Sequence, residues 1–283
     1  MEATERCLAF ARLALKVARA VLPCYGHKFS PRRFSLPQLA ACVLLKDYRQ
    51  LDWRGLEELL ALSPALRRSL GLVRVPDYST LWRFARRWLH AKQLSALQHR
   101  VVEQLGLKQV AIAIDSTGMD PERCSCYFTA RRGQRRARKR YVKLSLSVVI
   151  GPQIAASAVA DWGPCGDKVE VRRLLVETVQ RLSVRTIYAD GGYDAEWIHV
   201  WCRERRGIKS WIPPTVHRAD GKVGGYWRSQ MANGLPKDYG RRWAAESFIS
   251  GLKRTLGAGV RARQPGQQLR EALRKVLAYS IHR

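Results

Sequence analysis

One short stretch near the C-terminus places a carboxylate among cations at a regular spacing. Tyr239, Arg242, Glu246 and Lys253 lie in the sequence Tyr-Gly-Arg-Arg-Trp-Ala-Ala-Glu-Ser-Phe-Ile-Ser-Gly-Leu-Lys. Each residue of an ideal helix advances by about 100°, so Arg242, Glu246 and Lys253 project from one stripe, and Tyr239 lies one turn earlier. The carboxylate is suited to a hard divalent cation, and the cations around it are suited to a phosphate polymer.

Two aspartates further upstream each follow a short apolar run. Asp115 ends Val-Ala-Ile-Ala-Ile-Asp, and Asp190 ends Thr-Ile-Tyr-Ala-Asp before two glycines. Two carboxylates at strand ends and one on a late helix can share a pair of divalent cations. The structural alternatives are a turn former at Asp190 and a surface Arg242–Glu246 contact, worth about 0.2–0.5 kcal/mol. A surface contact explains neither Tyr239 nor Lys253.

These residues resemble the Y-x2-R-x3-E-x6-K signature of bacterial insertion-sequence transposases of the DDE class. Tyr239, Arg242, Glu246 and Lys253 match all four positions of the signature. Asp115 and Asp190 match the first and second catalytic aspartates of the family, in the same order. The resemblance runs from about Gln109 to the C-terminus. The interval between Asp190 and Glu246 is too short for the inserted β-domain that some relatives carry, so the resemblance does not extend to hairpin chemistry that depends on that insertion.

The resemblance implies a ribonuclease H-like catalytic domain that cuts and rejoins DNA. It implies that Asp115, Asp190 and Glu246 bind two Mg²⁺ or Mn²⁺ ions, and that Tyr239, Arg242 and Lys253 hold the DNA end near the scissile phosphate. The implied partners are the terminal inverted repeats of a mobile element, target DNA and a second copy of the chain in a synaptic dimer. A metal-dependent nuclease of the same fold, and an inactive DNA-binding protein derived from a transposase, remain as alternatives.

Composition independently indicates a polyanionic partner. Lysine and arginine number 51 against 23 acidic residues, which gives a formal charge of +28. Such a charge is costly in self-repulsion unless a polyanion neutralises it, and nucleic acid is the natural partner. Hydrophobic residues make up 46% of the chain, which is enough to form a buried core. The length of 283 residues corresponds to one large domain or two.

The hydrophobic periodicity changes once, near residue 108. Before this point the pattern predicts helices at residues 3–22, 36–48, 53–60, 79–90 and 92–105. After it the pattern predicts strands at 110–116, 141–150, 154–162, 186–190 and 210–213, and helices at 167–182, 195–206, 241–256 and 267–282. We therefore expect an all-helical, DNA-binding region at 1–108 and an α/β catalytic domain at 109–283, with its chemistry at strand ends.

Three further features are candidates for DNA contact. The helix that follows residues 77–80 carries Arg83, Arg86 and Arg87, and is either the reading helix of a helix-turn-helix or a solvated basic face. Residues 131–143 are rich in arginine and lysine and contain no acid, so they form either a phosphate-contacting loop or a solvated one. Trp162, Trp211 and Trp227 are candidates for stacking on an unpaired base.

No segment of the sequence has the pattern of a membrane span or a secretion signal. Arg12, Lys16 and Arg19 interrupt the N-terminal apolar stretch, and residues 151–153 break the longest uncharged run. We expect a cytoplasmic protein without a membrane partner. Asp161 and Asp167 match no catalytic position, and Asp167 and Asp194 are predicted to cap the helices that follow them.

Overall fold

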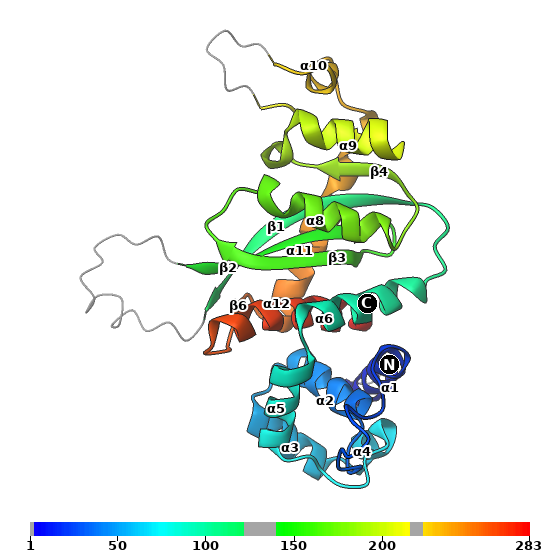
Figure 1. The fold of residues 1–283 in the computed structure, drawn as a ribbon, viewed down its shortest axis with the longest axis vertical. Coiled ribbons are helices and arrows are strands. Elements are labelled where there is room, and N and C mark those ends of the chain that lie inside the picture. Colours follow the sequence, from blue (N-terminus) through cyan, green and yellow to red (C-terminus); the bar gives the residue numbers. More distant parts are fainter. Residues whose placement is uncertain (1–2, 122–139, 216–222) are drawn as a thin grey trace, which may run out of the picture. The chain divides into compact units, whose positions relative to one another are not determined.

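A computed structural model describes residues 3–121, 140–215 and 223–283. The chain divides into two compact units. The helical unit comprises Met1–Gln104 and Leu252–Arg283, and the sheet unit comprises Leu105–Gly251. The order of elements along the chain can be followed in Figure 1.

The helical unit begins with six helices that agree with the predicted helical region, with one addition. They are α1 (Ala3–Val21), α2 (Leu36–Tyr48), α3 (Trp53–Leu62), α4 (Pro64–Leu70), α5 (Tyr78–Trp88) and α6 (Ala91–Glu103). The addition is α4, because Pro64 begins a helix instead of interrupting one. The Ser63 hydroxyl accepts a hydrogen bond from the Leu66 N–H, and Gly71 ends the helix in the left-handed conformation at φ 63°.

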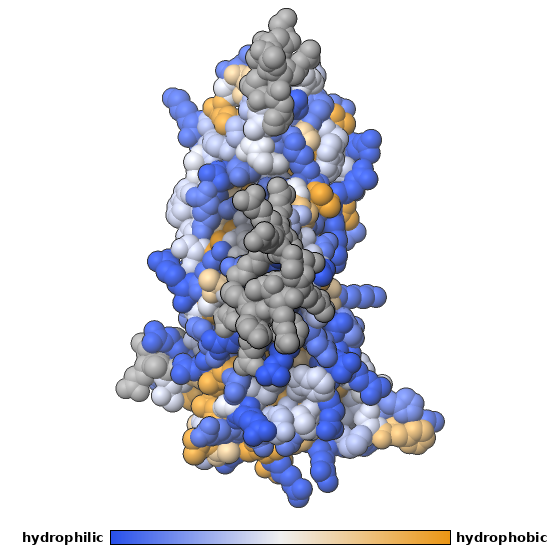
Figure 2. All heavy atoms as spheres, turned by 90° about the vertical axis from the view of Figure 1, so that its left-hand side faces the viewer, coloured by the Kyte–Doolittle hydropathy of each residue, from blue (hydrophilic) through white to orange (hydrophobic). Residues whose placement is uncertain are grey.

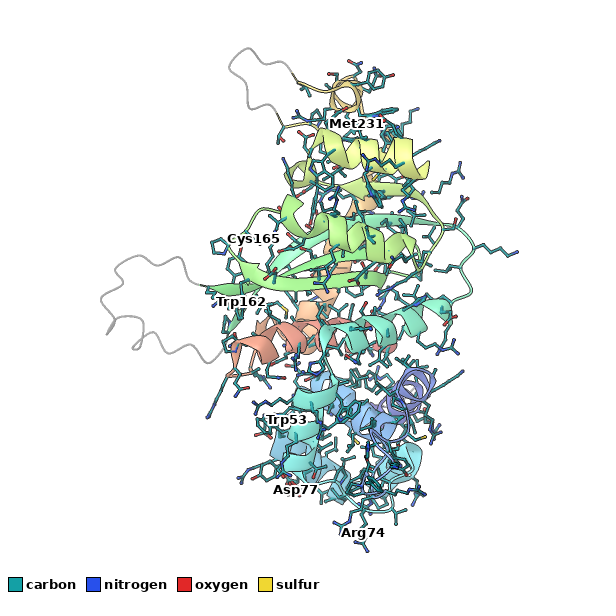
Figure 3. All side chains as sticks on the ribbon, viewed as in Figure 1. Trp53, Arg74, Asp77, Trp162, Cys165 and Met231 are labelled. Carbon is teal, nitrogen blue, oxygen red and sulfur yellow. The ribbon has the colours of Figure 1, made fainter. Side chains whose placement is uncertain are left out.

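Local capping explains where α2 and α5 start. Ser35 and Gln38 form a reciprocal capping box at the start of α2. The Asp77 carboxylate accepts a hydrogen bond from the Ser79 N–H at the start of α5, where Figure 3 labels it. This cap fixes where α5 begins, and so which positions its arginines occupy along the helix.

The C-terminal helix α12 (Pro265–His282) belongs to the helical unit, and the two-residue strand β6 (Gly259–Val260) precedes it. The buried Asp47 carboxylate on α2 lies 2.6 Å from Nε of the buried Arg274. Burial alone would raise the pKa of Asp47, but Arg274 and Lys46 hold it at about 2. The sequence-based division placed residues 109–283 in one domain. The structure differs because α12 packs against α2 and α6, within the other unit.

In the part of the sheet unit that the structure describes, five strands follow the order β3-β2-β1-β4-β5. Their bounds are β1 (Val110–Pro121), β2 (Tyr141–Val149), β3 (Ile154–Gly163), β4 (Val184–Ala189) and β5 (Lys209–Trp211). The first three strands are antiparallel, whereas β4 pairs with β1 in parallel and β5 continues in parallel. The helices required by parallel crossovers lie between these strands in the sequence.

Helices lie on both sides of the strands. Figure 1 shows α8 (Lys168–Val179) and α9 (Glu196–Arg206) in front of the sheet and α11 (Trp243–Leu256) behind it. Eight of the nine residues of β2 are buried, as expected for a strand covered on both faces. The unit is therefore a layered α/β structure with a mixed sheet, in agreement with the predicted class.

Two segments before α11 differ from the predicted loops and helices. Residues Tyr226–Ala232 form the short helix α10, and Lys237–Arg242 form the 3₁₀ helix η2. The predicted α-helix from residue 241 starts instead at Trp243, so Tyr239 and Arg242 precede it in η2. The tighter 3₁₀ winding places them differently from the ideal α-helical stripe.

The described helices include none that could span a bilayer. Figure 2 shows hydrophilic residues over much of the described surface on the face that it displays, with hydrophobic residues in smaller groups.

Candidate active site

The pairing of β1 with β4 brings the two predicted aspartates together. Ile114 on β1 pairs in parallel with Ala189 on β4. Asp115 follows Ile114, and Asp190 follows Ala189. Strand β4 ends at Ala189, whereas β1 continues to Pro121, and its pairing with β2 extends to Met119. Asp115 thus lies within its strand, not at its end as predicted, but at the position where its parallel neighbour stops.

The Asp115 carboxylate lies in an electrostatically unfavourable place. Its Oδ1 accepts a hydrogen bond of 2.8 Å from the Ser116 N–H. Burial, and then the negative charges of Asp190 and Glu246, raise the pKa of Asp115 to about 6, against the opposing effects of this hydrogen bond and of Arg242. The structure therefore brings Asp190 and Glu246 within electrostatic reach of Asp115, although the three carboxylates come from distant parts of the sequence.

Asp190 is held by the backbone that follows it. Its Oδ1 accepts a hydrogen bond of 2.9 Å from the Gly192 N–H, which starts the short 3₁₀ helix η1 (Gly191–Tyr193). A Cβ atom at Gly192 would stand 2.8 Å from Oδ2 of Asp167 and 3.0 Å from Oδ1 of Asp190. The turn-former interpretation of Asp190 is therefore compatible with a role in the carboxylate group, and Gly192 lets two carboxylates approach the same turn.

Glu246 makes an ion pair in the first turn of α11. Its Oε1 lies 2.6 Å from Nη1 of Arg242, and half of the Glu246 side chain is exposed. The predicted apolar face of this helix is confirmed, because Ala245, Ile249, Leu252 and Leu256 are buried. Glu246 lies at the edge of that face, which leaves its carboxylate accessible while the helix is anchored.

Tyr239 contacts the strand that carries Asp190. Its hydroxyl donates a hydrogen bond of 2.8 Å to the carbonyl oxygen of Ala189. Burial, opposed by the nearby Arg242 and assisted by the charges of Asp190 and Glu246, raises the pKa of Tyr239. The single hydroxyl proton is therefore committed to the backbone beside Asp190, and a phosphate contact donated by Tyr239 would require this bond to break.

The three carboxylates are chemically suited to bind divalent cations, but their side chains do not lie close enough together to bind one common ion. Among the described residues, no three His, Cys, Asp or Glu side chains stand close enough to hold a common metal ion. Three carboxylates whose charges repel one another are nevertheless the oxygen-rich donor set that Mg²⁺ and Mn²⁺ prefer. Glu246 would have to turn from Arg242 toward such an ion.

Behind Asp115 lies a polar network that the sequence analysis missed. The Asp167 carboxylate accepts hydrogen bonds from the Ser116 hydroxyl, at 2.6 Å, and from Nζ of Lys143, at 2.9 Å. Glu170 accepts a further hydrogen bond of 2.7 Å from Ser145 and lies 3.6 Å from Nζ of Lys143. The available signal was a lysine and serines within the apolar β2 segment, together with two acids three residues apart.

This network changes two sequence interpretations. Asp167 makes no side-chain capping bond to α8, so the predicted cap is wrong, and its carboxylate serves Ser116 and Lys143 instead. Lys143 is only 3% exposed, so this member of the basic run does not offer its charge to a phosphate on the surface. Burial opposes the charge of Lys143, but Asp167 and Glu170 raise its pKa.

The predicted cap at Asp194 is also wrong. No side chain caps α9 at its start. The buried Asp194 carboxylate instead accepts hydrogen bonds from the Thr215 N–H, at 2.8 Å, and from Nη2 of Arg228, at 2.6 Å. Asp194 therefore connects the segment after η1 to α10.

The remaining cations of the signature and of the first helices are accessible. Lys253 lies on α11, two turns after Glu246, and its side chain is partly exposed. Arg83, Arg86 and Arg87 are all exposed on α5. Arg86 lies 5.4 Å from the centre of the Trp82 ring, which restrains it on the helix surface.

The tryptophans proposed for base stacking have arginines over their rings. Arg140 lies 4.0 Å from the ring centre of Trp162, which lies near the end of β3 and is labelled in Figure 3. Arg203 lies 4.8 Å from the ring of Trp211 and 4.7 Å from that of Trp227. A base could stack on these faces only by displacing the guanidinium. Residues 131–139 of the basic run lie outside the described residues.

Comparison with protein-family models and with curated protein sequences gives no match. Among solved structures, the chain is similar to the piggyBac transposase in the cryo-EM structure of its synaptic complex with hairpin DNA. The TM-score is 0.48 and the sequence identity is 9%, over 97% of this chain and 73% of that one.

Proposed function

We propose that this protein is a DNA transposase with a ribonuclease H-like catalytic domain, which binds the ends of a mobile element and catalyses metal-dependent cleavage and strand transfer. The observation that carries the proposal is the convergence of Asp115, Asp190 and Glu246 beside Arg242. Burial first, and then the charges of Asp190 and Glu246, raise the pKa of Asp115 to about 6. Such pKa shifts are typical of functional sites, because a fold gains nothing in stability from gathering like charges.

The three carboxylates are the proposed ligands of two Mg²⁺ or Mn²⁺ ions. When bound, the ions supply activation of the attacking oxygen and stabilisation of the leaving oxygen in an in-line displacement. Asp115 and Asp190 offer ligands from adjacent strands, which are rigid elements. Glu246 offers the third from the first turn of α11. With this donor set no side chain needs to act as a nucleophile.

Arg242 is proposed to bind the DNA end, and its ion pair with Glu246 suggests how it becomes available. As Glu246 turns toward the divalent ions, Arg242 loses its carboxylate partner and its planar guanidinium can grip a phosphate with two hydrogen bonds. Lys253 is proposed to hold a second phosphate further along the DNA end. Tyr239 is proposed to support the site through its hydrogen bond to Ala189, the residue before Asp190, instead of contacting phosphate.

The helical unit is proposed to bind element ends through α5. Arg83, Arg86 and Arg87 give this helix an exposed basic face, which supports contact with the DNA backbone and is compatible with base reading. The formal charge of +28 supports the same partner. Joining two element ends to a target requires two copies of the site, so we propose a homodimer in the synaptic complex.

A plasmid assay with Mg²⁺ or Mn²⁺ tests the proposal. The DNA that flanks the encoding gene supplies candidate inverted repeats, which are placed on a donor plasmid and incubated with a target plasmid. We expect cleavage at the repeat ends and joined donor–target products. Cleavage without joining would identify a nuclease of the same fold, and binding without cleavage in either metal would identify an inactive DNA-binding protein.

A further inference from the structure

Two tyrosines connect β4 to η2 by reciprocal hydrogen bonds. The Tyr188 hydroxyl on β4 donates to Oδ2 of Asp238 on η2, at 2.6 Å. One residue further along each segment, the Tyr239 hydroxyl on η2 donates to the carbonyl oxygen of Ala189 on β4, at 2.8 Å. The bonds run in opposite directions between two pairs of consecutive residues, so they resist both sliding and separation of the segments.

Both connected segments lead directly into the candidate active site. Asp190 follows Ala189, and Arg242 lies one turn of η2 after Tyr239, next to the helix that carries Glu246. In η2, all of which the structure describes, no residue is buried and no side chain caps the start. A short 3₁₀ helix without buried residues is only weakly stabilised by packing against the rest of the fold. The two tyrosine bonds therefore supply specific fixation between the strand of Asp190 and the entrance to α11.

We propose that Tyr188, Asp238 and Tyr239 form a clamp that fixes the Asp190 carboxylate relative to Arg242 and Glu246, so that they are positioning residues for the metal-binding carboxylates. The role as metal ligands rests on the proposed function, whereas the mechanical role of the clamp does not. Catalytic groups must be held to within about 0.5 Å by the residues that support them. Tyr188 and Asp238 lie outside the four positions of the transposase signature, and Tyr239 acquires a different role from a phosphate contact.

The hydroxyl chemistry of the clamp is consistent with this role. Burial, together with the hydrogen bond to Asp238, raises the pKa of Tyr188. Tyr188 is 2% exposed, and its hydroxyl reaches from the buried strand to the half-exposed side chain of Asp238 on η2. The bond needs an acceptor at Asp238 but not its negative charge, and this distinction gives the test a conservative variant.

The test compares Tyr188→Phe and Asp238→Leu, which break the bond, with Asp238→Asn, which keeps an acceptor oxygen. Tyr226→Phe, at a tyrosine that is 66% exposed, is the matched control. Hydrogen exchange of the backbone amides is measured without metal or DNA. We expect faster exchange at residues 189–193 and 237–242 in the two breaking variants, by about two- to tenfold for one hydrogen bond, and little change in Asp238→Asn or Tyr226→Phe.

The second readout is the Mn²⁺ concentration that gives half-maximal cleavage. A loosened site must be ordered by the ions, so we expect this concentration to rise by about two- to tenfold in the breaking variants, with near-normal cleavage at saturating Mn²⁺. Tyr239→Phe should behave in the same way, with unchanged affinity for DNA in the absence of metal. Because Tyr188 and Asp238 share one bond, their double variant should be no worse than either single variant.

Unchanged hydrogen exchange in Tyr188→Phe and Asp238→Leu would overturn the clamp. If exchange changed but the half-saturating Mn²⁺ concentration did not, the clamp would be structural only, and its positioning role would be wrong. Failure of the proposed function would look different, since the wild-type protein itself would then cleave no DNA with either metal while the exchange measurement still decided whether the clamp exists.

Discussion

Nη1 of Arg242 lies 2.6 Å from Oε1 of Glu246, so the third carboxylate of the candidate site is paired with a cation of the same signature. The side chain of Glu246 is 50% exposed and that of Arg242 is 26% exposed. An i, i+4 pair on a helix contributes only about 0.3–0.5 kcal/mol. Divalent ions can therefore displace Arg242 at small cost. The same displacement would release the guanidinium for a phosphate, which couples metal binding to DNA binding.

Arg242→Gln should separate these two effects. Removal of the guanidinium takes away both a competitor for Glu246 and a positive charge near the ions, so Mn²⁺ should bind several-fold more tightly in the absence of DNA at pH 8. Binding of a pre-cleaved DNA end should weaken at the same time. Calorimetric titration measures the affinity for Mn²⁺, and a fluorescence assay measures the affinity for the DNA end. Weaker Mn²⁺ binding in Arg242→Gln would contradict the proposed competition.

Asp115→Asn, Asp190→Asn and Glu246→Gln should each abolish cleavage and leave DNA binding nearly unchanged. Each substitution removes one ligand charge from the ions without altering a phosphate-binding cation. Asp161→Asn, at an exposed aspartate on β3, is the matched control and should cleave normally. Cleavage and binding are measured on the same DNA end. A variant that retains more than about a tenth of the normal cleavage rate would show that its residue is not a ligand.

Asp115→Asn should also stabilise the metal-free protein at pH 8. The folded-state pKa of about 6 lies above the ordinary value of 3.8, so the charged carboxylate destabilises the fold at pH values above about 6. The penalty decreases as the pH falls and vanishes below about 4, where the carboxyl group is protonated in both states. We expect a gain of about 1–2 kcal/mol at pH 8, after allowance for solvent screening, and none at pH 4.

Urea unfolding with EDTA at the two pH values measures this difference. Asn keeps an oxygen that can accept the Ser116 N–H bond, so the substitution removes the charge without removing the local contact. An equal gain at both pH values would indicate a packing effect and not relief of charge repulsion.

Much of this site was predictable from the sequence, and the remainder depended on contacts between distant segments. The apolar runs before Asp115 and Asp190 predicted the two strands, but strand adjacency depends on pairing between segments and became visible only in the β1–β4 register. The stripe containing Glu246 predicted α11, whereas the 3₁₀ winding that directs Tyr239 to Ala189 depends on a long-range hydrogen bond. Local patterns carry no information on such partners.

The helical region shows the same limit. Its helices follow from periodicity and, for several of them, from capping residues. The association of α12 with this region depends instead on packing against α2 and α6 and on the buried Arg274–Asp47 pair, whose members are far apart in the chain. The position of Asp167 before a helix predicted a helix cap, but its carboxylate pairs instead with Lys143 on β2. Charged side chains that find buried partners across the fold are the residues for which local interpretation failed.

The arginines of α5 should contribute to affinity and to recognition of element ends. A protein that neutralises 6–10 phosphates should lose about a thousandfold or more in affinity between 50 and 200 mM salt. Replacing Arg83, Arg86 and Arg87 together by alanine should reduce the salt slope by about two to three units if all three contact phosphates. A loss of preference for element ends over random DNA would in addition indicate base reading.

We choose substitutions and not a truncation, because removal of residues 1–108 would expose the face of α12 that packs on α2 and α6. Arg172→Ala, at an exposed arginine of the sheet unit, is the matched control for lost charge. A flat salt response in the wild type would show that the basic surface serves another purpose. An unchanged slope in the triple variant would remove α5 from the DNA-binding surface.

Lys253 and Glu246 should show opposite defects, although they lie on one helix. Seven residues separate them, which is two turns and about 10.5 Å along the axis, too far for a direct ion pair but suited to a phosphate one or two nucleotides away. Lys253→Ala should leave Mn²⁺ binding intact, weaken binding of the cleaved end and reduce the salt slope by about one unit. Glu246→Gln should weaken Mn²⁺ binding and leave the salt slope unchanged. Loss of Mn²⁺ binding in Lys253→Ala, with normal DNA affinity and slope, would show that the cation and the carboxylate do not divide these tasks along α11.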